Sequence, residues 1–210
     1  MGAQETKEKI LKCTTELILE RGGDIRGVTI RMIAERAGIG VGLTNHYFSS
    51  KEQLVKECID SVFEELFGIL TGKKEAETEP GSDEAIENNA KTVMDFLIGH
   101  EAIARAALRR DVENPSENDY TARLVNAFAY AMADPRKIAE IRANDRMTDR
   151  MKEQFIEQFV SSQKIKAFMI VSSVKEAFIR RESLKKAFSC DLSDGDARDE
   201  FMESLMETVL

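Results

Sequence analysis

Apolar residues recur at intervals of three and four positions along nearly the whole chain, which is the spacing of one face of an α-helix. Alternating runs that would indicate strands are few, and no Asn-Gly turn joins two of them. The pattern predicts an all-α protein, with a first helix that ends at Gly22 and further helices over about 29–37, 41–48, 51–70, 83–97, 103–110, 120–132, 138–141, 147–181 and 197–210. We expect short polar side chains to cap several N-termini, namely Thr6, Thr29, Ser49 or Ser50, and Ser82 or Asp83.

Two of these helices, within residues 28–48, are short and are joined by a tight turn. Thr29 precedes the first of them, and its hydroxyl can accept a hydrogen bond from a free backbone N–H. Gly38 follows the last apolar position, where a left-handed residue turns the chain. Gly40 and Gly42 open the second helix; glycine is a poor helix former, but it lets backbone approach phosphate closely. This layout places the second helix where it can enter a DNA major groove.

The run from Lys9 to Lys56 resembles the DNA-binding domain of the tetracycline-repressor-like (TetR/AcrR) transcription regulators. Residues 10–22 are similar to the first helix of that family and the glycine that ends it. Residues 28–38 are similar to its second helix, and residues 42–51 to its recognition helix and Phe-x-Ser-Lys step. About a quarter of the chain carries these motifs, and the remainder fits the family by length and helical character.

Four positions of the second short helix depart from the family pattern. Asn45 stands where a Tyr is usual, Leu43 where a small residue is usual, and Val41 where a charged or polar residue is frequent. Thr44 replaces an inward-packing aliphatic residue, and we expect its hydroxyl at a half-buried site to lower stability unless it bonds to the backbone. The bases that this helix would prefer therefore cannot be inferred from those preferred by other members of the family.

Candidate DNA contacts lie at the start of the first short helix, along the second, and at the start of the next: Thr29, Arg31, Gly40, Val41, Gly42, Leu43, Asn45, His46, Tyr47 and Lys51. Lys51 and the N-terminus of its helix can bind a phosphate by charge and by free N–H groups. The resemblance implies a phosphate contact for the Tyr47 hydroxyl. The alternatives are capping alone for Thr29, packing alone for Tyr47, and solvated surface positions for Arg31 and Lys51.

Base edges would be contacted by the side chains between these phosphate contacts. Asn45 can read adenine through paired hydrogen bonds, and Val41 or Leu43 can meet a thymine methyl group. His46 has no metal-ligating partner nearby in sequence, so we expect it to face backbone or base.

The formal net charge of −8 is unevenly distributed along the chain. Residues 1–56 carry nine Lys or Arg and seven Asp or Glu, whereas the remainder carries 21 basic and 31 acidic residues. An acidic body would keep that part of the protein away from DNA. The polar stretch 71–82 is the clearest loop, and the resemblance implies a DNA-binding domain over 1–51 and a ligand-binding and dimerisation domain over 52–210.

Cys13, Cys58 and Cys190 have neither a CxxC spacing nor a zinc-ligand set with the two histidines. We expect Cys13 and Cys58 to be small buried hydrophobes on helices that pack together. A redox switch between these two cysteines is the sharper alternative.

The resemblance also implies a small-molecule pocket in the helical body. The chain has 11 Phe, 9 Met and no Trp, which suits an apolar and adaptable site. Candidate lining residues are Phe63, Phe67, Met94, Phe96, His100, Phe128, Met132, Met151, Phe155 and Phe168. The alternative for each is an ordinary position in the core.

The penultimate predicted helix carries apolar residues on more than one face, and the last carries one apolar stripe, which indicates packing on a partner as well as on the core. The alternative is a bundle that is fully internal to one chain. The resemblance implies a homodimer through a four-helix bundle, with the candidate interface residues Phe168, Val171, Val174, Phe178, Phe201, Leu205 and Val209. A two-fold dimer would place two recognition helices on a near-palindromic operator in double-stranded DNA.

Three functional interpretations remain. The first is a dimeric repressor released from its operator by a small, largely apolar effector. The second is the same fold used for DNA or protein contacts without a small ligand. The third, a helical enzyme, has no nucleophile motif, phosphate loop or metal spacing to support it, so we expect no catalytic activity, cofactor or metal. No apolar run reaches the ~20 residues of a membrane span and no secretory signal is recognisable, so we expect a cytoplasmic protein.

Overall fold

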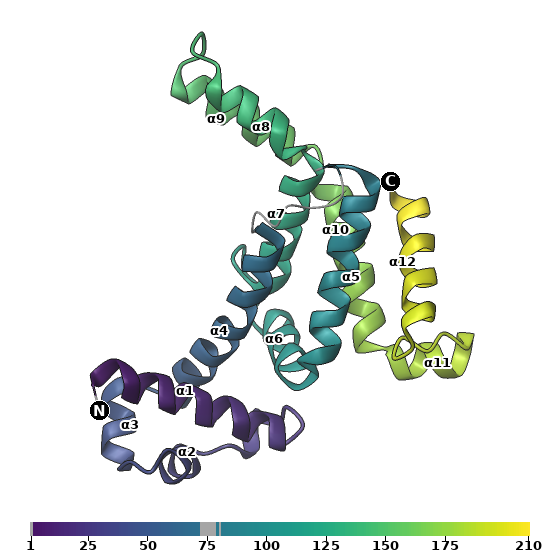
Figure 1. Ribbon diagram of the computed structural model, residues 1–210. Helices are drawn as coiled ribbons and strands as arrows, with labels where there is room; N and C mark the ends of the chain where they lie inside the picture. Colours follow the sequence, from purple (N-terminus) through teal and green to yellow (C-terminus); the bar gives the residue numbers. More distant parts are fainter. Residues whose placement is uncertain (1, 72–78, 80) are drawn as a thin grey trace. The chain divides into compact units, whose positions relative to one another are not determined.

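The computed structural model describes residues 2–71, 79 and 81–210, and these residues form helices and turns with no strand among them (Figure 1). The helices, with the short 3-10 helix η1, are α1 Ala3–Glu20, η1 Ile25–Gly27, α2 Ile30–Ala37, α3 Val41–Tyr47, α4 Lys51–Thr71, α5 Asp83–Gly99, α6 Glu101–Glu113, α7 Tyr120–Met132, α8 Pro135–Ala143, α9 Asp149–Ser161, α10 Lys164–Ile179, α11 Arg181–Phe188 and α12 Gly195–Val209. The all-α prediction is confirmed. Most of the loop predicted over 71–82 lies outside the described residues.

The chain divides into two compact units. The first consists of Met1–Leu66 with Gly99–Pro115, and the second of Phe67–Ile98 with Ser116–Leu210. The first unit therefore holds α1, η1, α2, α3, the first part of α4, and α6. The boundary predicted after residue 51 separates a DNA-binding domain from a ligand-binding and dimerisation domain. The two compact units do not test which residues carry these functions, so this boundary stays a prediction.

The first unit is built around an apolar core shared by α1, α2 and the residue that follows α3. α1 packs on α2 and α6, and α2 packs on α3. Ile10, Ile18, Ile33 and Phe48 are completely buried in this core. Burial of each such side chain stabilises the fold by roughly 1.5–3 kcal/mol. The unit thus has its own core, which fixes α3 against α2.

Three of the predicted helix caps are present in the structure. The Thr29 hydroxyl accepts a hydrogen bond from the backbone N–H at position 32, 3.3 Å away, and thereby caps α2. The Ser50 hydroxyl caps α4 in the same way at 3.1 Å, and the Ser82 hydroxyl caps α5 at 3.2 Å. Gly38 ends α2 in the left-handed conformation, with φ of 65°. These local signals set the starts of α2, α4 and α5 and the end of α2.

The prediction that Thr6 caps the first helix is wrong. α1 begins three residues earlier, at Ala3, with Gly2 as its N-cap. The Glu5 carboxylate accepts from the Gly2 N–H at 2.7 Å, which closes the N-terminus there. Thr6 lies in the first turn and its hydroxyl donates to the Gly2 carbonyl at 3.1 Å.

In the second unit, α7 and α10 pack along each other, and α10 also contacts α12. Leu124 and Phe128 of α7, with Ile170 and Val174 of α10, are almost completely enclosed. α7 has the predicted bounds, and the Asp119 carboxylate caps it by accepting from the backbone N–H at position 122 at 2.8 Å. These two helices form the core of the second unit.

The long helix predicted over 147–181 is wrong, because the structure divides it into α9 and α10. The interruption falls at Ser162 and Gln163. The Ser162 hydroxyl donates to the Phe159 carbonyl at 2.6 Å, and the Gln163 N–H bonds to the Val160 carbonyl, three residues back. A short polar side chain that bonds to nearby backbone competes with helix continuation, which accounts for the break. The separate helix α11 was not predicted.

Candidate nucleic-acid interface

The second short helix, α3, is held by a tight turn against α2. The N–H of Gly38 bonds to carbonyls at the end of α2, and the N–H of Ile39 bonds to the Ala34 carbonyl at 3.0 Å. One side of α3 faces the core through Thr44, and Phe48 seals the C-terminal end; both are completely buried. The remaining side of α3 is consequently open to solvent.

That open side carries the side chains predicted to contact bases. Val41 and Leu43 each expose 42% of their surface, and Asn45 and His46 are exposed as well. The His46 and Tyr47 rings meet edge to face, with centroids 5.6 Å apart. Exposed aliphatic side chains beside an amide are suited to thymine methyl groups and adenine edges.

The predicted phosphate contacts surround this face. Thr29 and Arg31 are exposed at the N-terminus of α2, whereas Tyr47 and Lys51 are half-buried at the end of α3 and the start of α4. The Lys51 ammonium donates to the Arg26 carbonyl at 3.4 Å, so α4 is tied at its first residue to η1. The structure thus gathers all ten predicted DNA contacts in the first unit, while their role in binding stays a prediction.

Two glycines at the start of α3 have no structural need to be glycine. Neither Gly40 nor Gly42 has a positive φ, and a Cβ added to either would meet nothing within 4 Å. Gly42 lies in the first turn of α3, where glycine is less favourable than alanine by up to about 1 kcal/mol. Gly40 is the N-cap of α3, a position at which glycine is preferred to alanine. Both leave a bare backbone at the surface, which admits close approach by another molecule.

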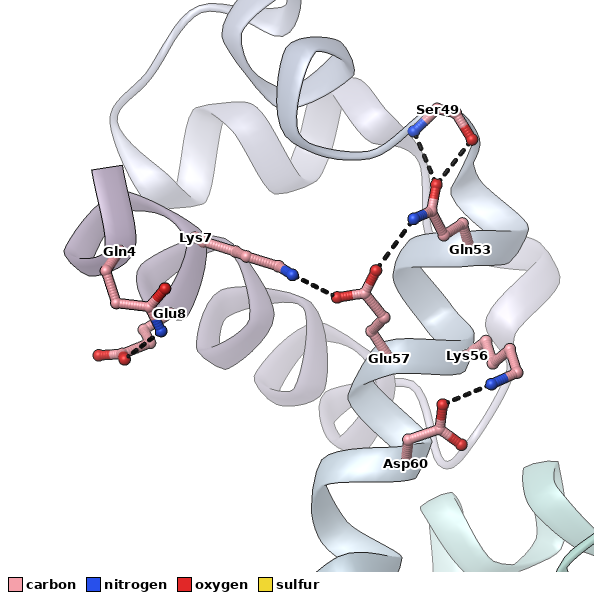
Figure 2. Close-up of polar contacts among 8 residues, drawn as sticks. All are labelled: Gln4, Lys7, Glu8, Ser49, Gln53, Lys56, Glu57 and Asp60. Atoms are coloured by element: carbon pink, nitrogen blue, oxygen red, sulfur yellow. Dashed lines mark hydrogen bonds and ion pairs between the residues drawn. The ribbon is translucent and has the colours of Figure 1, made fainter. Parts of the chain in front are cut away.

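A chain of polar contacts connects Ser49, which follows Phe48 after α3, to α4 and α1 (Figure 2). The N–H and hydroxyl of Ser49 both donate to the Gln53 side-chain oxygen, at 3.0 and 2.6 Å. The Gln53 amide donates to Glu57 at 3.0 Å, and the Lys7 ammonium lies 2.9 Å from the other oxygen of Glu57. The Lys7 ammonium also lies 5.7 Å from the centre of the Phe48 ring. These contacts fix the C-terminal end of α3. The spacing of four residues from Ser49 to Gln53 to Glu57 could have predicted two of them, whereas Lys7 is too far away in sequence for its contact with Glu57 to be predicted.

Thr44 is buried more deeply than the sequence predicted. Its exposed fraction is 0%, and its hydroxyl oxygen has no hydrogen-bond partner among the described residues. The backbone hydrogen bond that would have relieved this cost is absent there. A buried hydroxyl without a partner lowers stability by about 1–3 kcal/mol.

The cysteines of the first unit are buried, as predicted. Burial raises the pKa of the Cys58 thiol to about 11, and it also raises the pKa of the Cys13 thiol. The Cys58 thiol donates to the Leu11 carbonyl at 3.4 Å. A protonated, enclosed thiol is a poor nucleophile, which favours the packing role over the redox alternative.

Within the described residues, no cluster of His, Cys, Asp and Glu has the arrangement of a metal site. None of the described helices is both long and apolar enough to span a bilayer.

The residues predicted to line an effector pocket differ widely in burial. Five are core side chains, namely Phe63, Phe67, Met94, Phe96 and Phe128. Two are half-buried, namely His100 and Met132, and three expose 44–56% of their surface, namely Met151, Phe155 and Phe168. The Arg123 guanidinium lies 3.9 Å from the centre of the Phe67 ring and covers it. Two cavities are described, one in the first unit and one along α8 and α9, and neither is lined by any of the ten. The pocket stays a prediction.

The predicted dimer interface is only partly available on the surface. Val171, Val174 and Phe178 are at most 2% exposed, because α7 packs along this side of α10. These three are core residues of the chain itself, which corrects that part of the prediction. Phe168 is exposed, and Phe201, Leu205 and Val209 on α12 are half-buried. Ile165 and Met169, which the prediction omitted, are 75% and 46% exposed on α10.

A capped helix, a left-handed glycine turn and a second helix with one buried and one open side together define a helix-turn-helix DNA-binding domain. Residues 10–58 match the family model described as bacterial regulatory proteins, tetR family. The N-terminal segment of this chain is therefore similar to the DNA-binding segment of TetR-family regulators.

Several characterised proteins are similar to part of the chain. The HTH-type transcriptional regulator BetI of Vibrio parahaemolyticus is 30% identical over 76 residues, which are 36% of this chain and 38% of BetI. The HTH-type transcriptional repressor KstR2 of Rhodococcus jostii is 37% identical over 67 residues, 32% of each chain. The HTH-type transcriptional regulator PksA of Bacillus subtilis is 24% identical over 133 residues, 60% of this chain and 64% of PksA. The similar regions thus span between about a third and two thirds of these relatives.

Proposed function

We propose that this protein is a homodimeric transcriptional regulator that represses from a near-palindromic operator and is released by a small, largely apolar effector. The open face of α3, in a segment that matches the TetR family, carries this proposal. The name of the Rhodococcus jostii relative, a transcriptional repressor, supports the direction of regulation.

In the proposed complex, α3 enters the major groove. Asn45 reads an adenine edge, and Val41 or Leu43 contacts a thymine methyl group. Lys51 and Tyr47 bind phosphates on either side, together with the N-terminus of α2 at Thr29. The bare backbone at Gly40 and Gly42 lets α3 lie close to the sugar–phosphate chain.

The proposed dimer forms through α10 and α12. Ile165, Phe168 and Met169 expose large apolar surfaces on α10, and α12 packs against the same helix. Exposed apolar clusters of this kind are typical of protein–protein contact sites. A dimer is required for affinity, because residues 1–56 carry only two more basic than acidic residues and non-specific attraction to DNA is consequently weak.

The effector would act by binding more tightly to the conformation in which the two α3 helices are wrongly spaced for DNA. The Phe- and Met-rich core of the second unit supplies the apolar and adaptable surroundings for such a ligand.

The test is selection of bound duplexes from a random pool by the full-length protein, followed by sequencing. Recovery of a near-palindrome, and its release by a hydrophobic compound, would support the proposal. Many unrelated duplexes, or a motif that no compound releases, would support the alternative of a DNA- or protein-interaction module without a small ligand. Asn45→Ala should shift the recovered motif, and if it leaves both affinity and preference intact then α3 is not the recognition helix.

A further inference from the structure

The first unit contains a cavity that the proposed function does not use. It has a volume of about 500 Å3 and lies between η1, the first half of α4 and the C-terminal half of α6. All of its lining residues belong to the first unit, so it does not depend on how the two units are arranged. Small-molecule sites have volumes of about 300–1,000 Å3, and this cavity is large enough for one.

One part of the cavity lining is apolar. Val55 and Ile59 from α4 are 5% and 1% exposed, and Ala106 of α6 and Ile25 of η1 add further carbon surface. This surface suits a hydrocarbon stem.

The rest of the lining is charged, with four cations and three carboxylates. The cations are Arg26, Lys51, Arg109 and Arg110. None of the three guanidinium groups forms an ion pair with any residue that the structure describes. Arginine side chains that line one cavity and have no ion-pair partner among the described residues favour an anion, because a guanidinium binds a carboxylate or phosphate through two parallel hydrogen bonds.

The three carboxylates reduce the net charge of the lining to +1, but none of them forms an ion pair with one of the guanidinium groups. Asp24 accepts a hydrogen bond from the Arg26 backbone N–H at 3.1 Å and so is engaged in the η1 turn. The pKa of Glu52 is lowered by hydrogen bonds from its own backbone and from Ser50, at the start of α4. Glu113, the third, lies on α6 and forms no ion pair with any described residue.

We propose that this cavity binds a small amphipathic anion, with an apolar stem against α4 and a carboxylate between the arginines of α6 and η1, and that this ligand weakens DNA binding. The second half of the proposal rests on the proposed function. Lys51 lines the cavity and is also a predicted phosphate contact, so a bound anion competes with DNA for the same ammonium group. DNA then weakens ligand binding by the same factor, because the coupling is reciprocal.

Binding is tested first, without DNA, by isothermal titration calorimetry of the full-length protein with decanoate as the probe. We expect decanoate to bind, and decanol and decylamine to bind at least about tenfold more weakly, since a missing charge–arginine contact costs a factor of that order. Arg109→Gln with Arg110→Gln, and separately Arg26→Gln on the opposite wall, should each weaken decanoate binding by about tenfold or more. Arg150→Gln, at an exposed arginine of α9 that does not line the cavity, is the matched control and should have no effect.

Absence of decanoate binding, or equal binding by wild type and both cavity variants, would overturn the site. Circular dichroism melting of each variant distinguishes lost binding from lost folding. If either the Arg26→Gln variant or the Arg109→Gln with Arg110→Gln variant is unstable, the other one still tests the site.

Coupling is tested second, by fluorescence anisotropy on a selected duplex with and without saturating decanoate. We expect decanoate to reduce DNA affinity by a factor of about 5–150, the usual range for linked sites, and to have no such effect on the arginine variants. Decanoate binding that leaves DNA affinity unchanged would overturn the regulatory role. A protein that binds no duplex even without decanoate would instead refute the proposed function, while the calorimetry still decides the site.

Discussion

Replacement of Thr44 by valine should stabilise this protein. The Thr44 side chain is completely buried on the inner side of α3, and its hydroxyl has no hydrogen-bond partner among the described residues. Valine has nearly the same shape and the same branching at Cβ, so the packing and the side-chain rotamer are kept while the polar atom is removed. The folded state no longer has to bury an unsatisfied hydroxyl, which costs about 1–3 kcal/mol.

We therefore expect Thr44→Val to raise the free energy of unfolding by about 1–2 kcal/mol. In a chain of this length each 1 kcal/mol corresponds to a shift in Tm of roughly 2–4 °C. The assay is urea denaturation followed by circular dichroism at 222 nm, at one fixed protein concentration because a dimer would make stability depend on it.

Thr14 supplies the matched control. It is equally buried, but its hydroxyl donates to the Ile10 carbonyl at 2.7 Å. Thr14→Val removes this bond and should lower the free energy of unfolding by about 0.5–1.5 kcal/mol. If Thr44→Val were neutral or destabilising, or if the two substitutions had the same sign, the hydroxyl of Thr44 must be satisfied in solution and the reasoning fails.

Three further predictions concern DNA binding and pH. Gly42→Ala should raise the free energy of unfolding by about 1 kcal/mol in thermal melts and weaken DNA binding in anisotropy titrations. Gly38→Ala is the contrast, because Gly38 has a φ of 65° and alanine there should lower the free energy of unfolding. Unchanged DNA affinity in Gly42→Ala would exclude a close approach of DNA to the backbone at this position. Lys51→Ala should weaken binding to all duplexes and reduce the slope of log affinity against log salt by about one per half-site, while Asn45→Ala changes the preferred sequence; an unchanged salt slope would remove Lys51 from the phosphate contacts. The pKa of Cys58 is raised to about 11 in the folded protein from an ordinary 9.0, so the folded state holds the thiol proton more tightly than the unfolded state does. The free energy of unfolding should therefore fall as pH rises from about 9 to 11. Cys58→Ala should make this fall less steep, and an equally steep fall in the variant would contradict the prediction.

The residues around α3 fall into two groups, those that can contact DNA and those that hold α3 in position. The side chains on the open face of α3 are exposed, so they can be replaced with little effect on folding. Gln53 and Glu57 lie on α4 and hold the end of α3 through the hydrogen bonds of Ser49 (Figure 2). We expect substitutions at these two positions to change DNA affinity without contributing any contact to DNA themselves.

Local sequence signals were sufficient for the helix-turn-helix. Thr29 caps α2 and Gly38 ends it, because a hydroxyl one position before a helix and a glycine one position after it act on backbone groups only a few residues away. The bounds of α7 were predicted for the same reason. The placement of the ten candidate DNA contacts in one unit also follows from sequence order, since all ten lie within the 23 consecutive positions from Thr29 to Lys51.

Only the tertiary structure decided the features that depend on contacts distant in sequence. Val171 and Val174 of α10 were predicted to face a partner chain, whereas in the structure they are buried in the core of the same chain, where α10 packs on α7. The cavity of the first unit brings Arg26 and Lys51 together with Arg109, and no periodicity or motif in the sequence could place α6 beside η1. The sequence by itself determined the all-α class and most helix boundaries of the first unit, because those depend on neighbouring residues, but it did not place the break between α9 and α10 or the separate helix α11. Which apolar faces meet, and which charged groups are left without a partner, depended on the packing of the whole chain.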